Sequence, residues 1–140
     1  MEETTKGVYR ILDANLNRLK EGIRVVEDTA RYLHNDEDIA LSLKNLRHKA
    51  KLKNFNSLLR HRDSIQDVLK KTISSEINRD ELSKIVLANF KRAQESSRVL
   101  EEYLKHRELF EFGESEVFKC IRYELYELEK KFILKYFEGK

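Results

Sequence analysis

The chain has 140 residues, 38% of them charged and 40% hydrophobic, with four glycines and no proline. A chain of this length forms one domain, and its apolar content is high enough for a buried core, which argues against disorder. Glycine and proline shape the tight turns of β-proteins and phosphate-binding loops, so their scarcity argues against an all-β sandwich or a glycine-cradled nucleotide fold. The composition therefore predicts a mostly helical protein.

The charge, the cysteine content and the N-terminus exclude several partners. The net charge of +3 results from 28 cations and 25 anions, an excess too small to indicate nucleic-acid binding. Cys120 is the single cysteine and has no zinc-site spacing, so we expect a buried, inert thiol. The polar N-terminus and the lack of an apolar run of ~20 residues favour a cytoplasmic protein that contacts no membrane.

The first predicted helix covers about residues 5–33. Its apolar residues recur at alternating steps of four and three, which forms a heptad seam: Leu12, Leu16, Leu19, Ile23, Val26, Ala30 and Leu33. Asn35 can cap a second helix that runs to about Leu59. Residues 61–77 lack a helical period and are predicted to form a loop.

Two further helices are predicted in the second half of the chain. Asn78, with Glu81 three residues later, marks the start of a helix that continues to about Lys105. Gly113 ends the preceding segment, and Ser115 can cap a helix that reaches about Tyr136. Long helices with short connections favour an antiparallel four-helix bundle, so the predicted fold class is all-α.

The chain also contains an internal repeat. When residues 14–28 are shifted by 74 positions onto residues 88–102, seven of fifteen positions are identical. This predicts one helical domain over residues 1–140, with duplicated helical hairpins at about 5–60 and 78–137 joined by the 61–77 loop. The bundle is then expected to have approximate twofold symmetry.

A second stripe on the first helix carries polar residues that recur in the third. It contains Asn15, Arg18 and Gly22, matched by Asn89, Arg92 and Ser96. A bundle helix contacts two neighbours, so this stripe is predicted to face protein or a pocket, where polar groups need partners. A ligand pocket, a structural polar network and a dimer contact are three interpretations. Nearby Arg24, Glu27, Arg98 and Glu101 are expected to form surface ion pairs.

Two long blocks and several shorter ones carry a resemblance to a known family. Residues 9–18 read YRILDANLNR, residues 21–28 read EGIRVVED, and residues 88–103 read ANFKRAQESSRVLEEY. Residues 43–48, 62–63 and 118–123 extend the likeness over nearly the whole chain. These blocks resemble the helical hydroxymethylpyrimidine-phosphate kinase domain of thiamine biosynthesis, which occurs alone or ahead of a thiamine-phosphate synthase barrel. One departure is Leu69, where the family pattern favours glycine.

The resemblance implies a phosphomethylpyrimidine kinase that transfers a phosphoryl group from ATP, with Mg²⁺, to hydroxymethylpyrimidine phosphate. Phosphoryl transfer depends on positioned cations, so Arg18 and Arg92 are the catalytic candidates, oriented by Glu21 and Glu95. The substrate-binding candidates are Asn15, Asn89, Arg47, His48, Arg122 and Arg62, and the Mg²⁺ candidates are Asp63 and Asp67.

Two alternatives to the kinase belong to other functional classes. One is a non-catalytic helical module that binds or regulates a thiamine-phosphate synthase, or that forms a homodimer. The other is a helical enzyme whose arginines bind a dicarboxylate, which only the fold class supports. The expected partners are therefore small molecules, with a synthase or a second copy of the chain as the macromolecular candidates.

Overall fold

The structure is a computed structural model that describes residues 2–72, 79 and 81–138. These residues form helices and connecting segments, with no strand among them, which confirms the all-helical prediction. The elements are α1 (Glu2–Asp28), the π-helix η1 (Thr29–Leu33), α2 (Glu37–Lys49), α3 (Phe55–Arg60), α5 (Leu82–Tyr103), the 3₁₀-helix η2 (Arg107–Phe112) and α6 (Ser115–Tyr136). The predicted start of the third helix, Asn78, lies outside the described residues.

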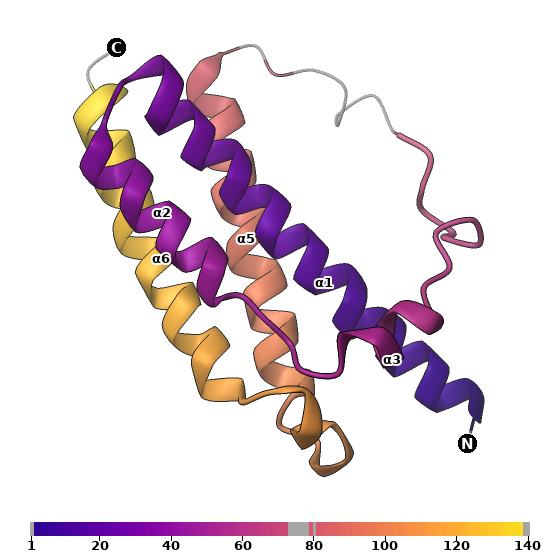
Figure 1. Cartoon of the computed structure of the whole chain (residues 1–140). Coiled ribbons are helices and arrows are strands. Elements are labelled where there is room, and N and C mark those ends of the chain that lie inside the picture. The colour runs from indigo at the N-terminus through magenta and orange to yellow at the C-terminus, as the bar shows by residue number, and fades with distance from the viewer. Residues whose placement is uncertain (1, 73–78, 80, 139–140) are drawn as a thin grey trace.

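The long helices pack as two hairpins, α1 with α2 and α5 with α6 (Figure 1). Helix α1 also lies along α5, and α2 contacts α6, while α3 packs against α1. The apolar seam of α1 lies in the core, where Leu12, Leu19 and Ile23 are fully buried. Leu33 is 49% exposed, so its predicted place in that seam is wrong. The π-helical turn explains this, because its wider turn shifts the residues that follow around the helix axis.

The contact between α1 and α5 is close at Gly22. A Cβ atom at this position would lie 3.0 Å from the carbonyl oxygen of Asn89 and 3.3 Å from the amide nitrogen of Ala93. Ser96 is buried on the facing helix. Small residues therefore allow the two backbones to approach each other.

The second helix is shorter than predicted, because it ends at Lys49 and not near Leu59. Leu52 is buried in the core, and the Lys53 amide donates a hydrogen bond of 2.7 Å to the Phe112 carbonyl. Asn54 adopts a left-handed conformation with φ of 55°, and α3 begins after it. These tertiary contacts compete with the continuation of the helix and redirect the chain.

The expected caps of two helices also differ by one residue from those observed. Asp36, not Asn35, caps α2, since its carboxylate accepts the Ile39 amide at 3.0 Å. Asn35 lies outside the helix with φ of 50°. Glu114 precedes α6, so Ser115 is its first helical residue and not its cap. Boundary shifts of this size do not change which helix faces meet.

Asp36 also joins the start of α2 to the end of α6. Its second carboxylate oxygen accepts hydrogen bonds from Lys135 Nζ at 2.7 Å and from the Tyr136 hydroxyl. The His34 ring stacks on the Tyr136 ring at a centroid distance of 3.8 Å. Burial raises the pKa of Asp36, but the hydrogen bonds from Ile39, Lys135 and Tyr136 outweigh burial, so the pKa is far below its ordinary value.

Two expectations from composition concern the surface. Within the described ranges, no helix combines the length and apolarity that a membrane crossing requires. Cys120 is exposed on α6, so the prediction of a buried thiol is wrong. The cysteine lies on the polar side of an amphipathic helix, whose core face carries Phe118 and Ile121.

Candidate functional site

A cavity of about 360 Å³ lies beside the N-terminal half of α1, where the segment after α3 returns to this helix. Helix α1 supplies one wall and residues 62–67 supply the other. The polar residues that line the cavity are Arg10, Asp13, Asn15, Asn17, Arg18, Arg62, Asp63, Ser64 and Asp67. The cavity therefore combines three guanidinium groups with three carboxylates.

A bidentate ion pair between Arg62 and Asp13 joins these two walls. Arg62 donates from Nε to one oxygen of Asp13 at 2.6 Å and from Nη2 to the other at 2.7 Å. Asp13 is only 3% exposed. The hydrogen bonds from Asp13 raise the pKa of Arg62, with burial acting in the opposite direction. This pair fixes the position of the 62–67 segment on α1, because both bonds must break before the segment moves away.

The other two arginines of the cavity form fewer hydrogen bonds and ion pairs than Arg62. Arg10 donates one bond of 3.3 Å to the backbone carbonyl of Asp63. Arg18 is exposed and has no ion-pair partner among the described residues. A guanidinium group offers five donors in a planar fork that suits phosphate and carboxylate groups. Arg10 and Arg18 therefore retain donors for an anion in the cavity.

The Mg²⁺ candidates Asp63 and Asp67 line the same cavity. One oxygen of Asp63 accepts the Gln66 amide and one oxygen of Asp67 accepts the Leu69 amide, each at 3.0 Å. Among the described residues, the other oxygen of each carboxylate accepts no hydrogen bond. In the described part of the chain, no three His, Cys, Asp or Glu side chains group closely enough to hold a metal. Mg²⁺ commonly takes one or two carboxylates together with phosphate oxygens and water, so the magnesium role stays a prediction.

The structure brings some of the candidate residues together and separates others. Asn15, Arg18, Arg62, Asp63 and Asp67 line one cavity, although they come from two segments of the chain. The remaining candidates do not line this cavity: Glu21, Arg47, His48, Asn89, Arg92, Glu95 and Arg122. Their assigned roles stay predictions.

The second stripe faces inward only in part. Asn15 and Gly22 are buried and Arg18 lines the cavity, but Arg92 is exposed and lies outside it, so the prediction that the stripe faces protein or a pocket is wrong for Arg92. Arginine carries its charge at the end of a long flexible side chain, so an exposed arginine keeps its guanidinium group hydrated. Asn15 and Asn89 each donate to the carbonyl four residues earlier, at 2.9 and 2.8 Å. Their amide groups therefore meet part of their hydrogen-bonding need within their own helices.

Two glutamates expected at the surface are buried. Glu27 is 1% exposed and accepts hydrogen bonds from Arg47 at 2.7 and 3.1 Å, which raise the pKa of Arg47. Glu101 is 4% exposed and accepts a hydrogen bond from Arg122 at 2.9 Å. Hydrogen bonds to the Tyr126 hydroxyl and to Glu101 raise the pKa of Arg122. Arg47 and Arg122 thus brace the two hairpins, whereas Arg24 and Arg98 are exposed as expected.

Sequence reasoning missed Arg10 and Asp13 as members of the site. Asp13 follows Leu12 of the apolar seam directly, but Arg24 and Arg31 also follow seam residues and are exposed, so this position alone did not mark Asp13 as buried. Its partner lies 49 residues away, a separation that helical periodicity cannot detect.

Comparison of the sequence with known protein families identifies the family of the chain. A model of the ThiD2 family matches residues 10–131, which include both walls of the cavity. The chain belongs to the ThiD2 family. No solved structure matches the chain.

Curated relatives of this ThiD2 chain are named thiamine-phosphate synthase. The protein of Nostoc punctiforme is 37% identical over 129 residues, which cover 91% of this chain and 36% of the relative. The protein of Thermosynechococcus vestitus is 37% identical over 126 residues, covering 89% of this chain and 35% of the relative. The chain thus spans about a third of the length of the curated relatives it matches.

These names correct the expected activity. Thiamine-phosphate synthase is a different enzyme from phosphomethylpyrimidine kinase, so the expectation of a phosphomethylpyrimidine kinase is contradicted. A role in thiamine biosynthesis agrees with both the resemblance and the comparisons.

Proposed function

We propose that this chain is a helical binding module of thiamine biosynthesis that holds a phosphate ester of the pathway and works with a thiamine-phosphate synthase. The observation that carries the proposal is the cavity beside α1, where Arg10 and Arg18 retain donors for an anion. The relatives support a synthase as partner, since their matched region is about a third of a longer chain.

The carboxylates of the cavity suit this ligand in two ways. Asp13 is neutralised by Arg62, so it does not repel an anion. Asp63 and Asp67 can share a Mg²⁺ ion with the phosphate oxygens, because Mg²⁺ readily bridges carboxylate and phosphate groups. We therefore expect Mg²⁺ to strengthen binding of the phosphate ester.

Calorimetric titration of the chain with thiamine phosphate, with and without Mg²⁺, tests the proposal. Thiamine without the phosphate is the ligand control. Arg18→Gln removes one charged donor and should weaken binding by about 1.5–3 kcal/mol, which is roughly tenfold or more. Arg24→Gln is the matched variant, since Arg24 lies on the same helix, is exposed and pairs with Asp28 outside the cavity.

Equal affinities of the Arg18→Gln variant and the wild type would reject the cavity as the ligand site. Equal binding of thiamine and thiamine phosphate would reject phosphate recognition. Addition of the chain to a thiamine-phosphate synthase barrel, with the rate of thiamine phosphate formation as readout, tests the partnership separately.

We also infer that the helices form a four-helix bundle of two duplicated hairpins with approximate twofold symmetry. Two contacts support this. Glu27 pairs with Arg47 between α1 and α2, and Glu101 pairs with Arg122 between α5 and α6. The amides of Asn15 and Asn89 make the same bond to their own helices. The pair Asp13–Arg62 has no counterpart in the second half, where Leu87 occupies the position of Asp13.

A further inference from the structure

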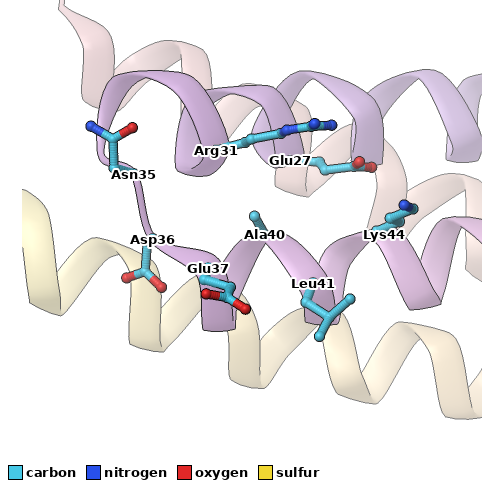
Figure 2. A pocket seen from close by; sticks show the side chains of 8 residues that line it. All are labelled: Glu27, Arg31, Asn35, Asp36, Glu37, Ala40, Leu41 and Lys44. Carbon is cyan, nitrogen blue, oxygen red and sulfur yellow. The ribbon is translucent and has the colours of Figure 1, made fainter.

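A second cavity, of about 310 Å³, lies between the C-terminal part of α1 with η1 and the first turns of α2 (Figure 2). Glu27 and Arg31 project from the first of these walls, and Leu41 and Lys44 project from α2. None of the residues that line it belongs to the cavity beside the N-terminal half of α1. It is therefore a separate candidate site.

Two of the three carboxylates at this cavity are already neutralised. Glu27 is paired with Arg47 through two hydrogen bonds. Asp36 is bound by Lys135 and by the Tyr136 hydroxyl. Glu37 has no ion pair within the described residues and is the one acidic group at the cavity whose charge is uncompensated there.

The two cations at the cavity have no such compensation. Neither Arg31 nor Lys44 forms an ion pair within the described part of the chain, and Arg31 makes only a cation–π contact with Tyr32, at 5.0 Å from the ring centroid. They reach the cavity from opposite walls, which Figure 2 shows. An anion between them can accept hydrogen bonds from both sides.

The internal repeat offers a comparison within the same molecule. The residue that corresponds to Arg31 in the second half is Lys105, which pairs with Glu102 at 2.8 Å and with Glu101 at 3.9 Å. In the first half, the counterpart of Glu102 is Asp28, which pairs with Arg24 at 3.3 Å just as Glu102 pairs with Arg98 at 3.1 Å, but no ion pair joins Asp28 to Arg31 among the described residues. The same position is therefore neutralised in one hairpin and open to a cavity in the other.

We propose that Arg31 and Lys44 bind a phosphate monoester in the cavity between α1 and α2. The two cations attract a phosphate dianion, and the uncompensated Glu37 is the one group at the cavity that opposes its binding. Ala40 and the exposed side chain of Leu41 line the same cavity and offer apolar contact to a short organic group on the ester. This site goes beyond the proposed function, because it shares no residue with the cavity that carries that function.

Titration of the ¹⁵N-labelled chain with glycerol 3-phosphate, followed by amide chemical shifts, tests this site, with glycerol as the control ligand. Saturable shifts should occur across residues 27–44. Arg31→Gln and Lys44→Gln should each weaken binding about tenfold, since each removes a charged donor. Glu37→Gln should strengthen binding, because it removes the uncompensated negative charge. Lys51→Gln is the matched control, since Lys51 is exposed and lines neither cavity, and it should bind as the wild type does.

Two results would overturn the proposal. One is an absence of phosphate-dependent shifts in residues 27–44 at saturating ester. The other is unchanged affinity in both Arg31→Gln and Lys44→Gln, each shown to be folded by circular dichroism. Shifts that occur only around Arg10 and Arg18 would reject this site while supporting the first cavity, and Arg18→Gln separates the two.

Discussion

Substitution of Gly22 by alanine tests how closely α1 and α5 approach each other. A Cβ at position 22 would lie 3.0 Å from the carbonyl oxygen of Asn89 and 3.3 Å from the amide nitrogen of Ala93. Both neighbours are backbone atoms of a helix, so they move only if the helices separate. Overpacking of this kind costs about 1–3 kcal/mol, whereas alanine stabilises a helix by about 0.5–1 kcal/mol relative to glycine. We expect a net loss of about 1 kcal/mol.

Gly7→Ala is the matched control for this experiment. Gly7 lies on the same helix, and a Cβ atom there would have no neighbour within 4 Å. In this variant alanine stabilises the helix relative to glycine, and its Cβ atom clashes with no neighbour. Its free energy of unfolding should therefore exceed that of the wild type by up to about 1 kcal/mol. The gap between the two variants then measures the cost of close contact.

Urea unfolding followed by circular dichroism provides the free energies, and thermal unfolding checks them. A change of 1 kcal/mol corresponds to about 4 °C in Tm for a domain of this size. If Gly22→Ala and Gly7→Ala change the free energy of unfolding equally, the helices do not meet at Gly22 as described. Stabilisation by Gly22→Ala would refute the reasoning outright.

Three other variants test buried carboxylates. Asp13→Asn should release the 62–67 segment and speed its cleavage by a protease, because the two charge-assisted bonds to this segment are weakened; an unchanged cleavage rate would contradict this anchor. Because the pKa of Asp36 is lowered in the folded state, its ionised carboxylate stabilises the fold above the unfolded pKa of about 4, and this stability is lost as the pH falls. Between pH 2 and 6, the free energy of unfolding of Asp36→Asn should therefore change less with pH than that of the wild type. The exposed Asp38→Asn should keep the pH dependence of the wild type. Glu101→Gln should cost about 2–4 kcal/mol in urea unfolding, since it leaves Arg122 half-buried without its carboxylate, while the exposed Glu102→Gln should change stability little; similar losses in both would reject the bracing role.

Helical periodicity predicted much of the fold and little of the site. The seam from Leu12 to Ala30 and the apolar face of α6 depend on residues three and four apart, which local spacing reveals. The early end of α2 escaped prediction because it depends on a hydrogen bond between Lys53 and Phe112. The pairing of Asp13 with Arg62 was not predicted for the same reason, since helical spacing carries no information about partners that are distant in the sequence.

The two halves of the repeat share contacts that the sequence did not predict, and the exposure expected for their glutamates is wrong. Matched residues in the two halves do form matched contacts, as Glu27 with Arg47 and Glu101 with Arg122 show. These glutamates were nevertheless expected at the surface, because their helical spacing to nearby arginines also suits exposed ion pairs. Burial depends on which helix packs over a position, and a single helix does not contain that information.

The sequence by itself determined that the chain is helical, that its polar residues recur in two halves, and that it belongs to a family linked to thiamine biosynthesis. Only the tertiary structure decided which charges are neutralised and which remain open to a ligand. Arg31 and Lys105 occupy equivalent positions, yet one borders a cavity and the other is paired. The physical reason is that charge compensation depends on distances between side chains of different turns and helices, which folding alone establishes.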